Sequence, residues 1–465
     1  MITRFIHRIL KKSHAKKVIV HGHALTPQKF NKRNHHINPE LLSKNAVKVT
    51  SVLQDAGYDA YIVGGAVRDL LLNIAPKDFD VATNATPEQV QKLFRRSRLI
   101  GRRFQIVHVT FYGKDRPEII EVSTFRAHVQ ADNAHVAASG RILKDNVWGN
   151  QAEDATRRDF SINAMYYDPS TETVLDYHDG MKDIGRKTIR MIGDPAQRYR
   201  EDPVRMLRAI RFAAKTNFKI EEPTLKPISE LAKLLQDIPS ARIFDEILKL
   251  LMSGHAWASL NGLRSVGLHH QIFPLLDAIL ENDDRRQFIQ TALDNTDQRI
   301  KAGKPVSAGF LFASLLWHDV QDAWATNENK DMPSIPALHA AIDDVLESQR
   351  AFLGMQRRHE ADMREIWTMQ PRLEKRVGRY PFRLVESPKF KAGYDFLLLR
   401  NQSNEIPENL AQWWTDFWQG DELQRDKLMA LVKPEPGSSA GTVNKKRRRR
   451  SKSAVKRSNP AEQTE

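Results

Sequence analysis

Asp78 and Asp80 are two aspartates separated by one residue at the start of an apolar stretch. Alternate side chains of a β-strand face the same side, so both carboxylates should project together while Phe79 points into the core. Two carboxylates held this close repel each other unless a divalent cation lies between them. A hard cation such as Mg²⁺ prefers carboxylate and phosphate oxygens as ligands. The pair therefore predicts a metal site for phosphate chemistry.

A glycine pair, Gly64 and Gly65, lies before this site, between a strand-like stretch and a short amphipathic segment that contains Arg68. Glycine allows a backbone to approach a phosphate closely, and the start of the following helix offers free N–H groups. A phosphate-binding turn beside a metal-binding pair predicts phosphoryl transfer. The alternative is that the two aspartates are solvated acids at the end of a strand.

Two adjacent arginines, Arg157 and Arg158, are flanked by acids and followed by the apolar residue Phe160. Charged groups are not packed against apolar residues unless they are paired, so this segment should hold either a ligand or an ion-pair network. Two further acids, Asp159 in this segment and Glu121 on a strand expected next to that of Asp80, are rivals as a third carboxylate.

A third group of charges surrounds Pro203, which suits the first turn of a helix. Arg205 and Arg208 are three residues apart and should share one helix face, with Asp202 at the helix start. An acceptor such as Asp202 and a donor such as Arg205 on one rigid helix can read the edge of a base without a template. An exposed, salt-bridged helix is the alternative.

The elements that position these residues follow from the hydrophobic pattern. Strand-like stretches rich in Val, Ile and Phe cover 58–63, 79–81, 106–111 and 118–123. One helix is expected over 41–56, and another is expected to begin at Thr86. Beyond residue 194 the pattern is helical. We therefore expect an α+β fold, in which a mixed-sheet head precedes an all-helical neck and body. The expected units are a basic extension (1–39), the head (40–183), the neck (184–265), the body (266–432) and a disordered basic tail (433–465).

The charge of the 465-residue chain is unevenly distributed. The formal net charge is +15, with nine Lys or Arg and no acid in residues 1–39, and nine more with no acid in residues 445–457. Glu462 and Glu465 remove two charges, so residues 40–444 sum to 15 − 9 − 9 + 2 = −1. Cationic arms on a neutral body indicate a polyanionic partner. The chain contains no Cys, which is compatible with a reducing cytoplasm, and no apolar run approaches the roughly 20 residues of a membrane span.

These motifs resemble those of the polymerase β-like nucleotidyltransferases, in the class that holds tRNA CCA-adding enzymes and bacterial poly(A) polymerases. The glycine turn with Arg68, the aspartate pair, the Arg157–Asn163 segment (with Ser161 in place of the usual Thr) and the Glu201–Arg208 segment match the family motifs. The resemblance implies a role for each set of residues. Asp78, Asp80 and Asp159 would be catalytic, with Asp78 and Asp80 as metal ligands, and the nucleotide would be bound by Gly64, Gly65, Arg68, Arg157, Arg158, Asp202, Arg205 and Arg208.

A fourth stretch, from Gly101 through Arg102 and Arg103 to His108, is similar to the poly(A) polymerase version of this family segment. The resemblance therefore implies a Mg²⁺-dependent, two-metal transfer of AMP from ATP to RNA 3′ ends with release of pyrophosphate. CCA addition to tRNA is the nearest alternative, and a non-catalytic RNA-binding protein is an alternative of another class. The expected partners are RNA 3′ ends, ATP and RNA-decay proteins, for a cytoplasmic monomer.

Removal of residues 433–465 should leave turnover at saturating RNA unchanged but raise the RNA concentration needed. The nine basic residues of the tail follow a linker of Pro, Gly and Ser, so they can contact phosphates without entering a rigid active site. Each lost phosphate contact should flatten the log–log salt dependence of RNA binding by about 0.7. Titrations of both forms over a salt series test this expectation. An unchanged slope would assign the tail to solubility or to a protein partner.

Overall fold

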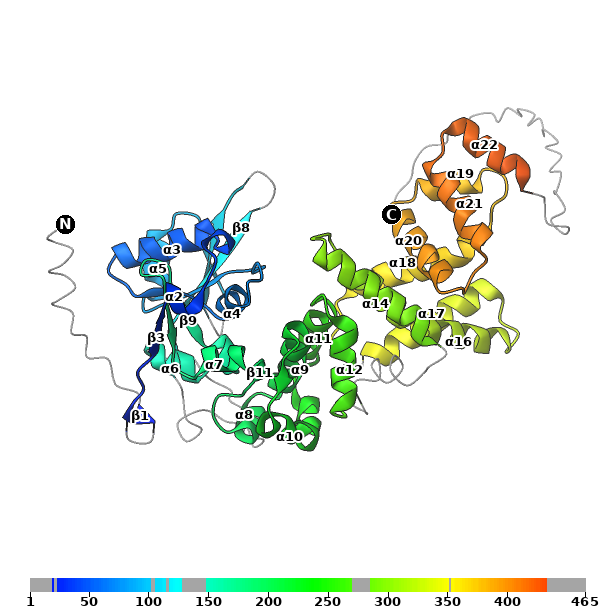
Figure 1. Ribbon diagram of the computed structural model, residues 1–465. Helices are drawn as coiled ribbons and strands as arrows, with labels where there is room; N and C mark the ends of the chain where they lie inside the picture. Colours follow the sequence, from blue (N-terminus) through cyan, green and yellow to red (C-terminus); the bar gives the residue numbers. More distant parts are fainter. Residues whose placement is uncertain are drawn as a thin grey trace, which may run out of the picture.

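A computed structural model describes residues 19–20, 23–101, 105–113, 117–127, 148–269, 285–350 and 353–432. Arg102, Arg103, the first 18 residues and the predicted basic tail therefore lie outside the described residues. The described chain consists of a head built on a β-sheet, followed by helices that extend away from it (Figure 1). The expected α+β architecture is confirmed.

The head contains an eight-stranded mixed sheet in the order β3-β10-β9-β4-β5-β8-β7-β6. Its strands are β3 (Gln28–Asn31), β4 (Ala60–Val63), β5 (Asp80–Thr83), β6 (Ser97–Ile100), β7 (Ile106–Phe111), β8 (Glu118–Thr124), β9 (Met165–Asp168) and β10 (Thr173–Asp176). The β5–β8 pair is parallel, and the other neighbouring pairs of this sheet are antiparallel. Two short pairs complete the described strands, β1 (Ile19–Val20) with β2 (His23–Ala24) and β11 (Thr188–Ile189) with β12 (Lys219–Ile220).

Helices of the head pack on both faces of this sheet. They are α2 (Lys32–His35), η1 (Pro39–Leu41), α3 (Lys44–Asp55), α4 (Gly65–Leu71), α5 (Pro87–Leu93), α6 (Gln151–Thr156), η3 (Ser161–Asn163) and α7 (Gly180–Gly185). Alternation along β4 places Ile62 in the apolar cluster beneath α3 and Val63 in the cluster on the opposite face. As expected from the sequence, α5 begins after the N-cap Thr86, whose side chain accepts a hydrogen bond from the N–H of Gln89.

The head begins earlier than the expected boundary at residue 40. Strand β3 pairs in antiparallel register with β10, from Asn31 opposite Thr173 to Gln28 opposite Asp176. His35 is buried, and its ring nitrogens contact the carbonyl oxygen of Glu172 and the N–H of Ile37. Residues 28–41 are therefore part of the head rather than an irregular extension, because their backbone completes one edge of the sheet.

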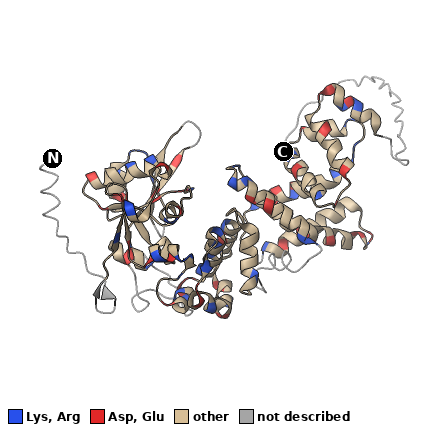
Figure 2. Cartoon of the chain, in the orientation of Figure 1, with Lys and Arg blue, Asp and Glu red and all other residues tan. Residues whose placement is uncertain are grey.

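The remaining described chain is helical. Its elements are α8 (Pro195–Glu201), α9 (Val204–Thr216), α10 (Glu222–Leu231), η4 (Ala232–Asp237), α11 (Ser240–Leu251), α12 (Ala256–Ser265), α14 (Arg286–Lys301), α15 (Ala308–Leu315), α16 (Trp317–Glu328), α17 (Ser334–Arg350), α18 (Arg357–Glu374), α19 (Tyr380–Val385), α20 (Phe390–Gln402), α21 (Glu408–Gln419) and α22 (Glu422–Leu431). Acidic and basic side chains are interspersed over these helices (Figure 2). In the described ranges, no helix combines the length and apolarity that a membrane crossing requires.

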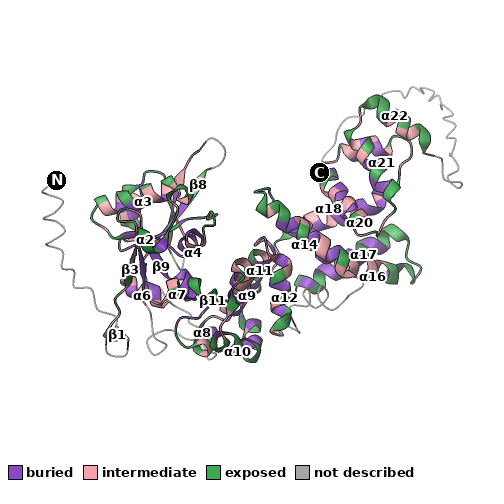
Figure 3. Cartoon of the chain, viewed as in Figure 1, coloured by how far each residue is buried: buried purple, intermediate pink, exposed green. Residues whose placement is uncertain are grey.

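One apolar cluster runs through the neck and most of the body, from Phe160 to Leu399 (Figure 3). The neck and body therefore share a core, although the sequence suggested a unit boundary near residue 265. A separate cluster holds the last helices together around Trp413, Trp414 and Phe417. The shared core supports α9, whose Arg208 and Lys215 form ion pairs with the head, and α11, whose Arg242 pairs with Asp202 of the neck.

Candidate active site

Two carboxylates lie side by side where β5 pairs with β8, and a third precedes β5. Asp78 precedes β5, Asp80 is its first residue, and Phe79 between them is buried while both aspartates are exposed. In the parallel register Asp80 lies directly opposite Glu121 of β8. Register partners point to the same face of a sheet, and adjacent strands are roughly 4.8 Å apart. The sheet thus brings Glu121 beside the predicted aspartate pair.

The electrostatics of Asp80 reflect this crowding. Although part of the Asp80 side chain is exposed, the surrounding protein displaces much of the water near its carboxyl group, and this effect, followed by the negative charge of Glu121, raises the pKa of Asp80 to about 6. Asp78 adds to this rise, whereas the positive charge of Arg158 opposes it. His108, opposite Glu121 on β7, lies with its Nε2 atom 3.3 Å from the Glu121 carboxylate. The negative charges gathered around Asp80 therefore favour the binding of a further cation.

Gly64 allows the aspartates and Arg158 to approach the same turn. Its φ angle of +73° is a left-handed conformation that glycine adopts without strain. A Cβ atom at this position would lie 3.4 Å from Arg158 Nη1 and 3.9 Å from Asp80 Oδ2. The glycine turn before α4 is therefore directly adjacent to one guanidinium and one carboxylate of the predicted site.

Asp154, within the short helix α6, holds the two adjacent arginines. Arg157 donates to Asp154 Oδ1 at 2.5 and 2.9 Å, and Arg158 donates to Oδ2 at 3.0 Å. Tyr166 also donates its hydroxyl to Oδ2, at 2.7 Å. Burial by itself raises the pKa of Asp154, but the two guanidiniums outweigh it and hold the pKa at about 2. Both arginines thus remain partly accessible while one buried anion fixes their orientation.

Within the described chain, Asp159 forms no hydrogen bond with Asp78 or Asp80. Its Oδ2 accepts hydrogen bonds from Arg208 at 2.6 and 2.7 Å, and its Oδ1 accepts from the N–H of Phe160 and from Asn163. Burial tends to raise the pKa of Asp159, but the Arg208 charge prevails and lowers it to about 2. Asp159 therefore links the head to α9, and Glu121 is the carboxylate that the sheet places beside Asp80.

Arg68 also occupies a structural position. It is 2% exposed and donates to Asp69 and to the Asn163 side chain, with its guanidinium 5.1 Å from the centre of the Phe212 ring. The expectation that Arg68 contacts triphosphate finds no support in this arrangement, because its side chain is directed into the interior. It ties α4 to η3 and to α9, which positions the glycine turn.

The predicted base-reading residues each have a partner in the described chain. Asp202, between α8 and α9, accepts a hydrogen bond from Arg242 of α11 at 2.7 Å through its Oδ2 atom. Its Oδ1 atom is buried and lacks a hydrogen-bond partner among the described residues. Arg205 donates to the Glu201 carboxylate and to the carbonyl oxygen of Arg198. The two side chains thus lie on one rigid corner, where Asp202 retains an unused acceptor.

No role in the site was predicted from the sequence for Asp154, Tyr166, Arg198 or Arg242. Arg198 donates to the backbone carbonyl oxygens of Arg157 and Arg158, at 2.7 and 2.6 Å. The spacing of Asp154, three and four residues before the arginines, was a usable signal because such side chains share a helix face. Tyr166 and Arg242 carry no comparable local signal.

The head sheet, its paired carboxylates and the adjacent arginines define a nucleotidyltransferase. Three protein-family profiles match the chain: "Poly A polymerase head domain" over residues 60–190, "Probable RNA and SrmB-binding site of polymerase A" over 217–280, and "Polymerase A arginine-rich C-terminus" over 330–453. Poly(A) polymerase I of Salmonella typhi is 43% identical over 430 residues, which cover 90% of this chain and 91% of that protein. The chain therefore belongs to the poly(A) polymerase I family.

CCA-adding enzymes are more distant. The enzyme of Enterococcus faecalis is 38% identical over 209 residues, 45% of this chain and 49% of that protein. A solved structure described as a tRNA-processing enzyme in apo form I superposes with a TM-score of 0.55 at 21% identity, covering 89% of this chain and 100% of that one. This similarity shows a shared fold, and the poly(A) polymerase interpretation of the sequence is confirmed by the relatives that match over most of their length.

Replacement of Asp80 by Asn should raise the melting temperature of the metal-free protein at pH 7. The ionised carboxylate is disfavoured in the folded state, because its pKa is raised from 3.8 to about 6. The difference from the wild type should narrow as pH falls through 6 toward 4, where the wild-type carboxyl group binds a proton. Thermal unfolding in EDTA over this pH range provides the measurement. A lower melting temperature of Asp80→Asn at pH 7 would contradict the crowding of carboxylates.

Proposed function

We propose that this chain adds AMP from ATP to the 3′-hydroxyl of RNA without a template, at the site where β5, β8 and the Gly64 turn meet. The attacking 3′-oxygen forms a bond to the α-phosphorus of ATP, and the bond to the bridging oxygen breaks to release pyrophosphate. The single observation that carries the proposal is the parallel register of Asp80 and Glu121 beside Arg158. RNA and ATP are the partners this reaction requires, and the cytoplasm supplies both.

Nucleotidyltransferases of this kind normally use a divalent metal ion, and the carboxylates fit one. In the described residues no group of three His, Asp or Glu side chains forms a ready-made metal site. Mg²⁺ does not need such a site, because it is commonly bound by one or two carboxylates together with substrate phosphates. Asp78 and Asp80 would supply the carboxylates, with Glu121 as the third acid. When bound, the metal activates the 3′-hydroxyl and neutralises charge on the phosphates.

Arg157 and Arg158 are the groups proposed to hold the triphosphate. Their guanidiniums are 22% and 17% exposed, and Asp154 holds them in place on the protein side. Arg158 Nη1 makes only a long 3.5 Å contact with the carbonyl oxygen of Asn163, so it can donate to a phosphate near Gly64 and Gly65. A guanidinium with a fixed orientation suits phosphate oxygens because it presents several donors in one plane.

Asp202 and Arg205 are proposed to select adenine. The unused Oδ1 acceptor of Asp202 can receive an exocyclic amino group, and Arg205 can donate to a ring nitrogen once it leaves Glu201. Arg208 has a different position, because its pairing with Asp159 holds the head against α9. We therefore propose Arg208 as a support for the base-binding corner rather than a direct contact to the nucleotide.

CCA addition is the alternative within the class, and RNA binding without catalysis is the alternative outside it. The proximity of Asp80 to Glu121 and Asp78 at the start of β5 disfavours a purely binding role, since crowded acids alone repel RNA. Incorporation of single nucleotides into a short RNA, with ATP and CTP supplied separately, separates all three functions. AMP addition alone supports polyadenylation, addition of both nucleotides supports CCA synthesis, and no addition supports a binding protein.

The third carboxylate can be assigned by comparing Glu121→Gln with Asp159→Asn. Glu121→Gln should reduce kcat at least a hundredfold while the fold is retained, because it removes an acid that contacts the reacting site. Asp159→Asn should lower the free energy of unfolding by about 3 kcal/mol, because it leaves the Arg208 charge without its partner. Single-turnover rates and denaturant titrations test both. Full activity in Glu121→Gln would restore Asp159 as the candidate.

Replacement of Arg205 should change the choice of base more than it changes overall turnover. Arg205→Ala removes the donor proposed to face adenine, so the ratio of ATP to CTP incorporation should fall about tenfold or more. Arg208→Ala is the matched comparison on the same helix, and its effect should be lower stability with the ratio preserved. Competition assays with both nucleotides give the ratio. An equal loss for ATP and CTP in Arg205→Ala would assign Arg205 to a structural role.

A further inference from the structure

A cavity of about 520 Å³ lies between the end of α17 and the start of α18, away from the carboxylate site. Arg350 ends α17, and Arg357 and Arg364 lie on α18, with Glu360 between them. Nothing in the proposed reaction uses this cavity. Its charged lining consists of three guanidinium groups and one carboxylate.

Three cations converge there on a single buried carboxylate. Arg350 donates two hydrogen bonds to Glu360, at 2.9 and 2.7 Å. This hydrogen bonding, together with the charges of Arg350, Arg364 and Arg357, holds the pKa of Glu360 below its usual value. Three guanidiniums against one carboxylate leave the lining with a charge of +2. Arg364 also pairs with Asp343, outside the lining, whereas Arg357 forms no ion pair with any described residue.

The cavity has a rigid connection to the neck. The backbone at Gly354 approaches the first turn of α11 so closely that a Cβ atom would lie 2.6 Å from the backbone nitrogen of Ala241. The neighbouring Leu353 is buried in the apolar cluster shared by neck and body. The next residue after Ala241 is Arg242, which donates to Asp202. The arginine-lined cavity and the proposed base-binding corner therefore adjoin the same helical turn.

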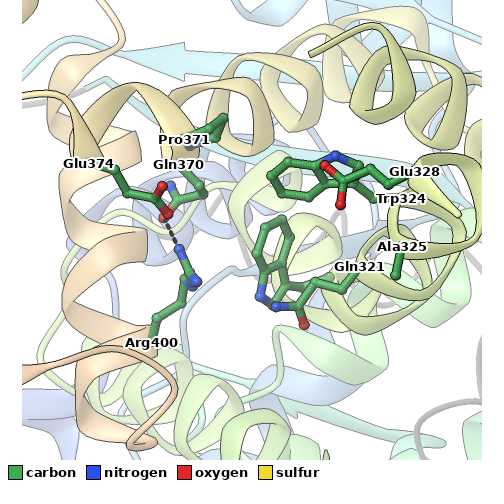
Figure 4. Close-up of a pocket in the computed structure, with 9 residues that line it drawn as sticks. Gln321, Trp324, Ala325, Glu328, Gln370, Pro371, Glu374 and Arg400 are labelled. Atoms are coloured by element: carbon green, nitrogen blue, oxygen red, sulfur yellow. Dashed lines mark hydrogen bonds between the residues drawn. The ribbon is translucent and has the colours of Figure 1, made fainter. Parts of the chain in front are cut away.

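A second cavity, of about 210 Å³, provides a contrast (Figure 4). It is lined by Trp317 and Trp324 and by the carboxylates of Glu328 and Glu374. Its one arginine, Arg400, already donates to Gln370 and Glu405. The carboxylates disfavour a phosphate group in this cavity. Of the two cavities, the arginine-lined one is therefore the better site for an anionic ligand.

We propose that the cavity formed by Arg350, Arg357 and Arg364 binds a phosphodiester group of the RNA strand upstream of its 3′ end. The inference rests on the proposed function, because it concerns the RNA that presents its 3′-hydroxyl to the head. Guanidinium groups match phosphate oxygens in geometry and charge. RNA is favoured over a free nucleotide because the cavity lies apart from the proposed triphosphate site, yet adjoins α11 beside the corner proposed to select the incoming adenine, next to which the RNA end must lie during transfer.

The test compares Arg357→Gln with Arg358→Gln in the full chain. Arg358 is the neighbouring exposed arginine, lies outside the cavity lining and likewise forms no ion pair in the described chain. The two variants therefore lose the same charge, and neither leaves a buried partner unpaired. Binding of a fluorescent oligoadenylate, measured without ATP over a salt series, is the primary readout. Melting temperatures verify that both variants are folded.

Arg357→Gln should weaken oligoadenylate binding roughly threefold to tenfold at low salt and flatten the log–log salt slope by about 0.7, while Arg358→Gln has a much smaller effect. KM for ATP and kcat at saturating RNA should remain unchanged in Arg357→Gln. Equal losses of oligoadenylate affinity in the two variants would show that only the overall positive charge matters. A raised KM for ATP with unchanged RNA binding would make the cavity a nucleotide site. Either result overturns the proposal. If the wild type adds no AMP, the proposed function fails, but the binding comparison still decides the role of the cavity.

Discussion

The carboxylate of Asp154 is the anion on which the arrangement of the active site depends. It is buried, and it accepts hydrogen bonds from two adjacent guanidiniums and a tyrosine hydroxyl. A buried charge is costly unless it is paired, so this network has essentially one low-energy geometry. That geometry places Arg158 beside Gly64 and Asp80, and the sheet then adds Glu121. The positive and negative halves of a phosphoryl-transfer site thus meet at one turn.

A second set of buried polar contacts joins the head to the neck. Asp159 pairs with Arg208 of α9, Arg68 links α4 to Asn163, and Arg198 of α8 holds the backbone beneath the two arginines. Removal of one partner from such a pair leaves the other charge buried, so these contacts resist displacement. Because the proposed base-binding corner belongs to the neck, these contacts also position it relative to the proposed triphosphate site. Asp159 and Arg68, which belong to the family motifs, therefore hold neighbouring elements together in this structure.

The helical part extends this connection. The neck and body share one apolar cluster, and Gly354 brings the α17–α18 junction against the first turn of α11. Charges on α11 and α18 consequently have fixed positions relative to the corner formed by Asp202 and Arg205. A polymerase without a template must hold both the incoming base and the growing strand with protein groups alone. Rigid helices with a shared core meet this requirement better than a flexible arm, which holds nothing in a fixed geometry.

Local pattern was sufficient to predict much of this protein. Alternation and β-branched residues predicted β7 over 106–111, a Thr-Pro pair predicted the start of α5, and the buried Phe79 between two exposed aspartates followed from strand periodicity. These features are local, because they depend on neighbours a few residues away, although the strand itself begins only at Asp80, so Asp78 and Phe79 precede it. The head, the helical region and the enzyme class followed from them together with the family motifs.

Tertiary structure decided which charged residues face the reaction and which face each other. Asp159 and Arg68 match the motifs of the family, but packing against α9 and η3 turns them into buried links. Glu121 stands beside Asp80 through strand register, and Arg242 reaches Asp202 from another helix. The sequence by itself determined which residues are charged and which element carries each one. Only the fold decided their partners, because the pairing of a side chain depends on segments that are distant in the chain and adjacent in space.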